Sequence, residues 1–265
     1  MDATHILVVN AAVIAVCFAV LWLISIRLKD VSFVDSWWAV GMVVAAWTTY
    51  LVTGGHGPHA MALLAICTIW GLRLGIHLFW RWRKSGPDPR YVAMLGKAQS
   101  ERGWSFGKAS LMIVFAMQAP LMFVVCLPVQ LGQYAVTTAL GPMAWLGVAL
   151  AVMGVGFESI GDLQLSRFKA DPANQGAVLD TGLWRYTRHP NYFGDACVWW
   201  GLYLIAAETG WVGAASILGP ITITFLLTKL SGVPMLEDRM RRRRPGYEAY
   251  IRRTSSFIPL PPRAP

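Results

Sequence analysis

The sequence predicts an all-α membrane bundle of seven transmembrane helices. Apolar residues make up 55% of the 265 residues and charged residues only 14%, whereas a soluble domain usually carries about 25% charge. The apolar residues form seven long blocks, and most of these reach the roughly 20 residues that a helix needs to cross the hydrocarbon core. This pattern leaves room for one transmembrane domain and excludes a second sizeable soluble domain.

The blocks cover residues 5–26, 35–53, 59–79, 109–131, 138–165, 192–208 and 211–230. The first is longer than the apolar core of a secretory signal and ends in Arg27 and Lys29 rather than in small residues, so we expect a transmembrane helix. The fifth continues into the amphipathic stretch Glu158–Phe168. The sixth is short and follows His189-Pro190, where a proline suits the first turn of a helix.

The distribution of basic residues predicts the orientation. With the N-terminus outside, the external segments are the N-terminal tail, Thr53–Pro58, Leu131–Thr137 and Ala207–Thr209, and none contains Lys or Arg. Apart from Arg73, the basic residues fall on the other side or at helix ends facing it, as the positive-inside rule requires. We therefore expect a multi-pass protein of the cell inner membrane, with loops 80–108 and 166–191 and the C-terminus in the cytoplasm. The net charge of +9 then reflects topology, not nucleic-acid binding, with Arg241–Arg244 near anionic headgroups.

The run Gly182–Asp195 gathers polar residues around the expected start of the sixth helix. Arg185 and Arg188 suit phosphate oxygens near the free N–H groups of a helix N-terminus. Asn191 and Asp195 are four residues apart on one helix face, which suits ribose hydroxyls or a carboxamide. The plainer alternative is a basic membrane-edge loop with a helix cap.

Other polar residues stand inside or beside apolar blocks, where each needs a reason. Glu158 and Asp162 share a helix face, and with Arg167 they either meet a ligand or form a structural ion pair. Arg73 is expected to meet either a ligand phosphate or a carboxylate. Asp35 is either a helix N-cap or a buried acid that donates a proton or hydrogen bond. The four cysteines lack metal-ligand spacing, and we expect no metal site.

Three stretches carry a family resemblance: Gly182–Asp195, the tail Met235–Met240, and the segment from Tyr247 to Pro259. They resemble the C-terminal domain of the steroid 5-alpha-reductase family, and the Arg-His-Pro-Asn-Tyr-x-Gly-Asp run is also similar to membrane sterol reductases. The similarity is strong over about 155–260 and weaker in the N-terminal half. It implies seven helices, a cytoplasmic NADPH site and a lipophilic enone substrate.

The resemblance also implies roles for individual residues. Residues 1–137 would form the substrate side and residues 138–265 the cofactor side. Asp35 is the counterpart of the family's substrate-side carboxylate; Trp70 stands where the family has a tyrosine, so His77 or Tyr91 would take that catalytic role. The expected cofactor contacts are Arg73, Arg90, Glu158, Asp162, Arg167, Tyr186, Arg188, His189, Asn191, Tyr192, Asp195, Lys229, Glu237 and Tyr247.

The expected function is NADPH-dependent reduction of the C=C bond of a lipophilic enone, such as a 3-oxo-4-ene steroid, that enters from the bilayer. Membrane lipids are then the expected partners, with no nucleic acid and no obligatory protein partner. Isoprenylcysteine methyltransferases share a similar Arg-His-Pro-x-Tyr-x-Gly run and bind S-adenosylmethionine, which is the first alternative. A non-enzymatic lipid-binding or transport protein is the second. The cations Arg73, Arg90, Arg167 and Arg188 favour NADPH, which carries three phosphates.

Overall fold

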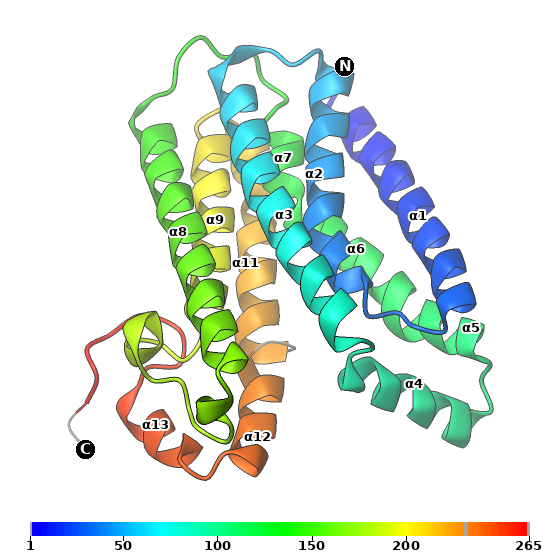
Figure 1. Ribbon diagram of the computed structural model, residues 1–265. Coiled ribbons are helices and arrows are strands. Elements are labelled where there is room, and N and C mark those ends of the chain that lie inside the picture. The colour runs from blue at the N-terminus through cyan, green and yellow to red at the C-terminus, as the bar shows by residue number, and fades with distance from the viewer. Residues whose placement is uncertain (1, 231–232, 264–265) are drawn as a thin grey trace. The chain divides into compact units, whose positions relative to one another are not determined.

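The computed structural model describes residues 2–230 and 233–263, and these residues form helices and no strand (Figure 1). The α-helices are α1 (Ala3–Leu28), α2 (Val34–Thr53), α3 (Gly57–Ser85), α4 (Pro89–Arg102), α5 (Phe106–Ser110), α6 (Ala116–Val125), α7 (Leu127–Leu131), α8 (Pro142–Ala170), α9 (Pro190–Ala207), α10 (Trp211–Ala214), α11 (Leu218–Phe225), α12 (Val233–Arg243) and α13 (Tyr247–Arg253). The shorter 3-10 and π turns are η1 (Leu111–Phe115), η2 (Pro172–Asn174), η3 (Gly182–Arg185), η4 (Ala215–Ile217) and η5 (Leu226–Leu230).

Each apolar block of the sequence overlaps a helical segment, and the fifth block begins four residues before α8. Five of these segments are long and apolar enough to cross a membrane, and they are Ala3–Leu28, Gly57–Ser85, Phe106–Val125, Pro142–Ala170 and Trp211–Leu230. The protein is therefore an all-helical membrane protein. α2 and α9 occupy the other two blocks; α2 has Asp35 in its first turn, and α9 has Asp195 in its second.

α4 is a helix that the hydropathy pattern did not predict, because it is polar and short. Asp88 caps it by accepting a hydrogen bond from the Arg90 backbone N–H at 2.9 Å, and Pro89 follows the cap, where its missing N–H costs nothing. The helix ends at Gly103, which has a left-handed φ of 62°. α4 runs across the ends of α1–α3 rather than alongside them (Figure 1).

The chain divides into two compact units. Unit 1 comprises residues 1–145 and 202–219, and unit 2 comprises residues 146–201 and 220–265. In unit 1, α2 and α3 approach closely at Gly71, where an added Cβ would lie 2.8 Å from the Ala39 carbonyl oxygen. In unit 2, α8 and α9 approach closely at Gly194, where an added Cβ would lie 2.5 Å from the Gly154 carbonyl oxygen. Small residues thus let helix backbones meet in both units, as is common in membranes.

Candidate functional site

The first polar cluster lies in unit 1, where the start of α2 meets α4 and α6. We call Asp35, Arg90, Tyr91 and Gln118 the Asp35 cluster. The Tyr91 hydroxyl donates to Asp35 Oδ1 at 2.6 Å, and Gln118 Nε2 donates to the same hydroxyl at 3.1 Å. Arg90 Nη2 donates to Asp35 Oδ2 at 3.2 Å. Two carboxylate oxygens, a phenol, a guanidinium and an amide therefore form one hydrogen-bonded chain.

Local contacts hold α4 where it can bring Arg90 and Tyr91 to Asp35. The Asp88 backbone N–H donates to Ser32 Oγ at 2.7 Å, which fastens the start of α4 to the segment before α2. Arg90 also binds Asp88, with Nη2 and Oδ2 2.9 Å apart. Trp38 Nε1 donates to Gln118 Oε1 at 2.7 Å and orients that amide. The cluster is thus positioned by three separate helices.

The surroundings keep Tyr91 a neutral phenol. Burial, and then the neighbouring Asp35 carboxylate, raise the pKa of Tyr91 well above its ordinary value. Burial acts to lower the pKa of Arg90, but its bonds with Asp88 and the charge of Asp35 outweigh this and raise that pKa. A protonated hydroxyl beside a fixed guanidinium is a hydrogen-bond donor that does not lose its proton near neutral pH.

Asp35 therefore does not act as a helix cap. The N-cap position of α2 is occupied by Phe33 without a side-chain cap bond, and the Asp35 carboxylate reaches α4 instead. Of the three expected catalytic residues, the structure brings Asp35 and Tyr91 together. His77 and Arg73 lie on α3 in the same unit, both half-buried. Arg90, expected at a cofactor phosphate, is placed against two carboxylates.

The second polar cluster lies in unit 2, between the loop before α9 and α12. We call Arg188, His189 and Glu237 the Arg188 cluster. Arg188 Nε lies 2.8 Å from Glu237 Oε1, and His189 Nε2 lies 3.2 Å from the same oxygen. Burial acts to raise the pKa of Glu237, but the bonds with His189 and Arg188 lower it to about 2. Burial lowers the pKa of His189, so the carboxylate is charged and the imidazole neutral at neutral pH.

Thr187 and Arg188, just before α9, also bind the C-terminal tail. Arg188 Nη1 donates to the carbonyl oxygens of Ile251 and Thr254, and its backbone N–H donates to Ser255 O at 2.9 Å. Thr187 Oγ1 donates to Phe257 O at 2.9 Å. The guanidinium of Arg188 is thus occupied by the protein itself, although the sequence suggested a phosphate contact.

The third polar group lies along α8 and the start of α9. Glu158 and Asp162 are 3% and 7% exposed, respectively, so two carboxyl groups are buried on one face of α8. Asn191 Nδ2 donates to Asp162 Oδ1 at 3.3 Å. The close approach at Gly194 brings α9 against Glu158 itself. Asp195 lies one turn after Asn191 and is half-buried.

The remaining expected cofactor residues are spread around unit 2. Arg167, Tyr186 and Lys229 are exposed. Tyr192 stacks on His189, with ring centroids 5.4 Å apart and planes 7° apart. Tyr247 is buried, and burial raises its pKa to about 12.

The chemistry of unit 2 fits a nicotinamide dinucleotide. The buried carboxylate of Asp162 can accept from ribose hydroxyls, and the half-buried amide of Asn191 can both accept from and donate to hydroxyls or a carboxamide. The exposed cations Arg167 and Lys229 suit phosphate oxygens. A phosphate contact by Arg188 is not needed, because Arg167 and Lys229 can take that role.

The site also contains three residues that were not predicted from the sequence: Gln118, Trp38 and Asp88. Gln118 had a readable signal, because an amide inside the apolar block 109–131 is costly unless it is bonded. Asp88 was readable as the cap before Pro89. Trp38 was not, because its bond to Gln118 spans 80 residues.

The length and hydropathy of these helices place the chain in the class of membrane proteins with several apolar helices. The chain belongs to the family described as "Protein of unknown function (DUF1295)", whose model matches residues 21–254. That family includes proteins that resemble steroid 5-alpha-reductases. An uncharacterized protein of Schizosaccharomyces pombe is 22% identical over an alignment of 269 residues. The alignment covers 91% of this chain and 76% of that protein. No solved structure matches the chain significantly.

Proposed function

We propose that this protein is an NADPH-dependent reductase of the C=C bond of a lipophilic enone, such as a 3-oxo-4-ene steroid or a similar lipid. The observation that carries the proposal is the contact between Tyr91 and Asp35, 2.6 Å from hydroxyl to carboxylate, with Gln118 beside it. A neutral phenol held in place by a carboxylate and an amide is the kind of donor that polarises a ketone. The family's resemblance to steroid reductases supports the same reaction class.

In the proposed reaction, the Tyr91 hydroxyl turns its single hydrogen from Asp35 to the substrate's carbonyl oxygen when the substrate binds, and Gln118 still donates to the phenol oxygen. NADPH, when bound, would supply the hydride that adds to the carbon beta to the carbonyl, and water would supply the proton that adds to the alpha carbon. Negative charge develops on the carbonyl oxygen, and a donor fixed there in advance stabilises it. Before the substrate binds, Asp35 accepts from both the phenol and Arg90 Nη2 and so holds the phenol in position.

The proposal assigns cofactor binding to unit 2. Asp162, Asn191 and Asp195 would hold hydroxyl and amide groups, and Arg167 and Lys229 would meet phosphates. Glu158, Tyr186 and Tyr192 are further candidate contacts. Arg188, His189, Glu237 and Tyr247 would act indirectly, by holding the loop before α9 against the tail.

The proposal also assigns seven membrane spans, with the N-terminus outside and the catalytic groups at the cytoplasmic side of the inner membrane. The helical segments at all seven apolar blocks and the positive-inside pattern support it. Cysteines introduced as Ser100→Cys and Val136→Cys would report it, because an impermeant thiol reagent added outside cells should label only the second.

One observation favours the methyltransferase alternative. Arg90 and Arg188 are bound to carboxylates of the protein, which leaves fewer cations for the phosphates of NADPH than the sequence suggested. S-adenosylmethionine carries no phosphate, so it needs none of them.

The test is isotope transfer. The purified protein, lipophilic enones and NADPH carrying deuterium at the transferable position are combined, and the product is examined by mass spectrometry. The proposal expects one deuterium in a product that has lost its C=C bond. Methylated product with S-adenosylmethionine, and no reduction of any enone, would replace it with the alternative.

A further inference from the structure

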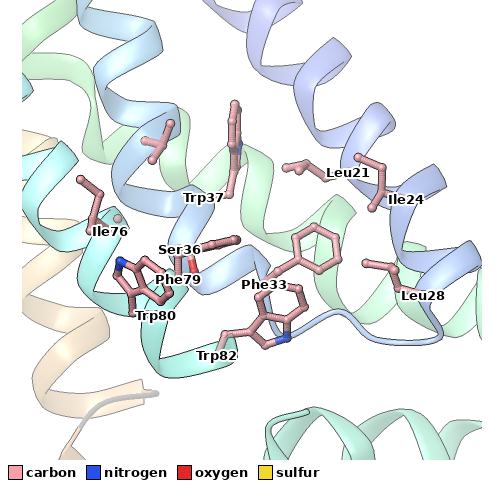
Figure 2. Close-up of a pocket in the computed structure, with 12 residues that line it drawn as sticks. Leu21, Ile24, Leu28, Phe33, Ser36, Trp37, Ile76, Phe79, Trp80 and Trp82 are labelled. Atoms are coloured by element: carbon pink, nitrogen blue, oxygen red, sulfur yellow. The ribbon is translucent and has the colours of Figure 1, made fainter. Parts of the chain in front are cut away.

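Unit 1 contains a pocket of about 470 Å³ formed by α1, α2 and α3. Figure 2 shows aliphatic and aromatic side chains around it, among them Leu28, Phe33, Trp37 and Trp80. Its volume lies in the roughly 300–1,000 Å³ range of small-molecule sites. Hydrocarbon walls of this kind suit a hydrocarbon ligand.

The aromatic wall of the pocket is fixed in position. Phe33 meets Trp82 edge to face, with ring centroids 5.9 Å apart, and Phe79 lies 5.6 Å from the same indole. Trp82 Nε1 donates to Asp30 Oδ2 at 2.7 Å, so the indole is held by a polar anchor as well as by its ring contacts. The pocket is therefore built before any ligand arrives.

This pocket is separate from the Asp35 cluster. Ser36, Trp37 and Val40 line the pocket, whereas Asp35 turns toward α4. At about 100° per residue, Asp35 points to nearly the opposite side of α2 from these side chains. The proposed reaction does not account for the pocket.

The pocket opens on a surface suited to lipid. Ile76 and Trp80, on its α3 side, are 56% and 59% exposed, and Ile24, on its α1 side, is 41% exposed. In a membrane protein, large exposed apolar side chains on spanning helices face acyl chains.

Exposed cations lie next in sequence to lining residues of the pocket, at the ends of α1 and α3. Arg27 and Lys29 flank the lining residue Leu28, and Arg83 and Lys84 follow the lining residue Trp82. All four are exposed. The nearby carboxylate of Asp30 is occupied by the Trp82 indole and the Ser32 backbone N–H. The ends of the helices that line this apolar slot thus carry exposed cations, and one of them, Lys29, has its Nζ 5.4 Å from the centroid of the Phe106 ring.

We propose that this pocket binds an acyl chain of an anionic glycerophospholipid, with the headgroup phosphate against Arg27, Lys29, Arg83 and Lys84. Basic pockets between membrane helices bind anionic headgroups. The apolar slot supplies the second half of the recognition, because it removes part of the chain from the bilayer. This inference is independent of the proposed reductase activity.

The test is lipid retention by the protein in neutral detergent, measured by native mass spectrometry. Phosphatidylglycerol and phosphatidylcholine with identical chains are titrated separately. We expect phosphatidylglycerol to bind at lower concentration. Arg27→Gln with Arg83→Gln should weaken it about 30-fold, taking roughly fivefold for each cation. Filling the slot with Ile24→Trp, or with Ile76→Trp if the first variant does not fold, should abolish the preference.

A matched control is Arg252→Gln with Arg263→Gln, which removes the same charge from exposed positions in unit 2 that lie outside the Arg241–Arg244 run. It should leave phosphatidylglycerol binding unchanged. Equal binding of both lipids, retention by a slot-filled variant, or equal weakening by the control pair would overturn the inference. Displacement of the lipid by a lipophilic enone would assign the pocket to substrate and overturn the proposed occupant. NADPH binding is measured on each variant, so failure of this inference is distinguishable from failure of the reductase proposal.

Discussion

The Asp35 cluster and the Arg188 cluster each pair an arginine with a carboxylate, and their surroundings differ. In unit 1, the side chains of Arg90 and Asp35 are 30% and 24% exposed, and the pair ends in the Tyr91 hydroxyl. In unit 2, the side chains of Arg188 and Glu237 are 8% and 12% exposed, and the guanidinium also binds carbonyls of the C-terminal tail.

The difference indicates different roles. A buried pair whose remaining donors are satisfied by backbone is a structural fastening, and removing one partner leaves an uncompensated charge. A partly exposed pair that ends in a phenol holds a donor that can turn from Asp35 to a ligand. Residue type alone does not separate the two roles.

The largest effect on stability is expected when the Arg188–Glu237 pair is broken. Glu237→Ala should destabilise the protein by about 3–5 kcal/mol, because Arg188 stays buried without its partner. The matched change Glu248→Ala removes an exposed carboxylate 3.4 Å from Arg241 and should cost no more than about 1 kcal/mol. Thermal unfolding in detergent measures both; equal losses would remove the contrast between the clusters.

The Asp35 cluster should show the reverse behaviour, a loss of turnover with little loss of stability. Tyr91→Phe and Asp35→Ala should each lower turnover about 100-fold, since removing a single charge-stabilising donor typically has that effect. NADPH affinity should stay nearly unchanged. The control is Tyr134→Phe, at an exposed tyrosine of unit 1. Full turnover by Asp35→Ala would refute its assignment.

A smaller effect is expected on the α8–α9 polar face. Asn191→Ala removes a donor to Asp162 and should weaken NADPH binding about tenfold. Gln175→Ala, at an exposed loop residue, should leave it unchanged. Equilibrium titration gives the dissociation constant of NADPH for both variants. If Asn191 has only a structural role, its replacement would lower the melting temperature and leave the NADPH affinity unchanged.

The smallest effect is the part of the pH dependence of stability that comes from the Arg188 cluster. Burial lowers the pKa of His189 from 6.5, so its contribution to stability is fully present above pH 6.5 and decreases as the pH falls below it. The lowered pKa of Glu237 adds a contribution that is present above pH 4.5 and is lost as the pH falls toward about 2. Relative to wild type, Glu237→Gln should lack the lower step, worth on the order of a few degrees in melting temperature.

The sequence predicted the helices better than the contacts. Block lengths and Pro190 predicted the start of α9 because these signals are local. α4 was missed, since a polar segment gives no hydropathy signal. Asp35 and Tyr91 were both proposed, but their contact spans 56 residues, and only tertiary structure shows it. Arg188 was read as a phosphate ligand because its partner Glu237 lies 49 residues away.

The central claim is that the protein binds a nicotinamide cofactor. The most direct measurement is thermal stabilisation of the purified protein by NADPH, NADH and S-adenosylmethionine at matched concentrations, because a ligand that binds only the folded state raises the melting temperature by mass action. A nicotinamide reductase predicts a shift with NADPH that Asn191→Ala reduces, and no shift with S-adenosylmethionine. A shift with S-adenosylmethionine alone would contradict the claim and direct the search to methyl acceptors.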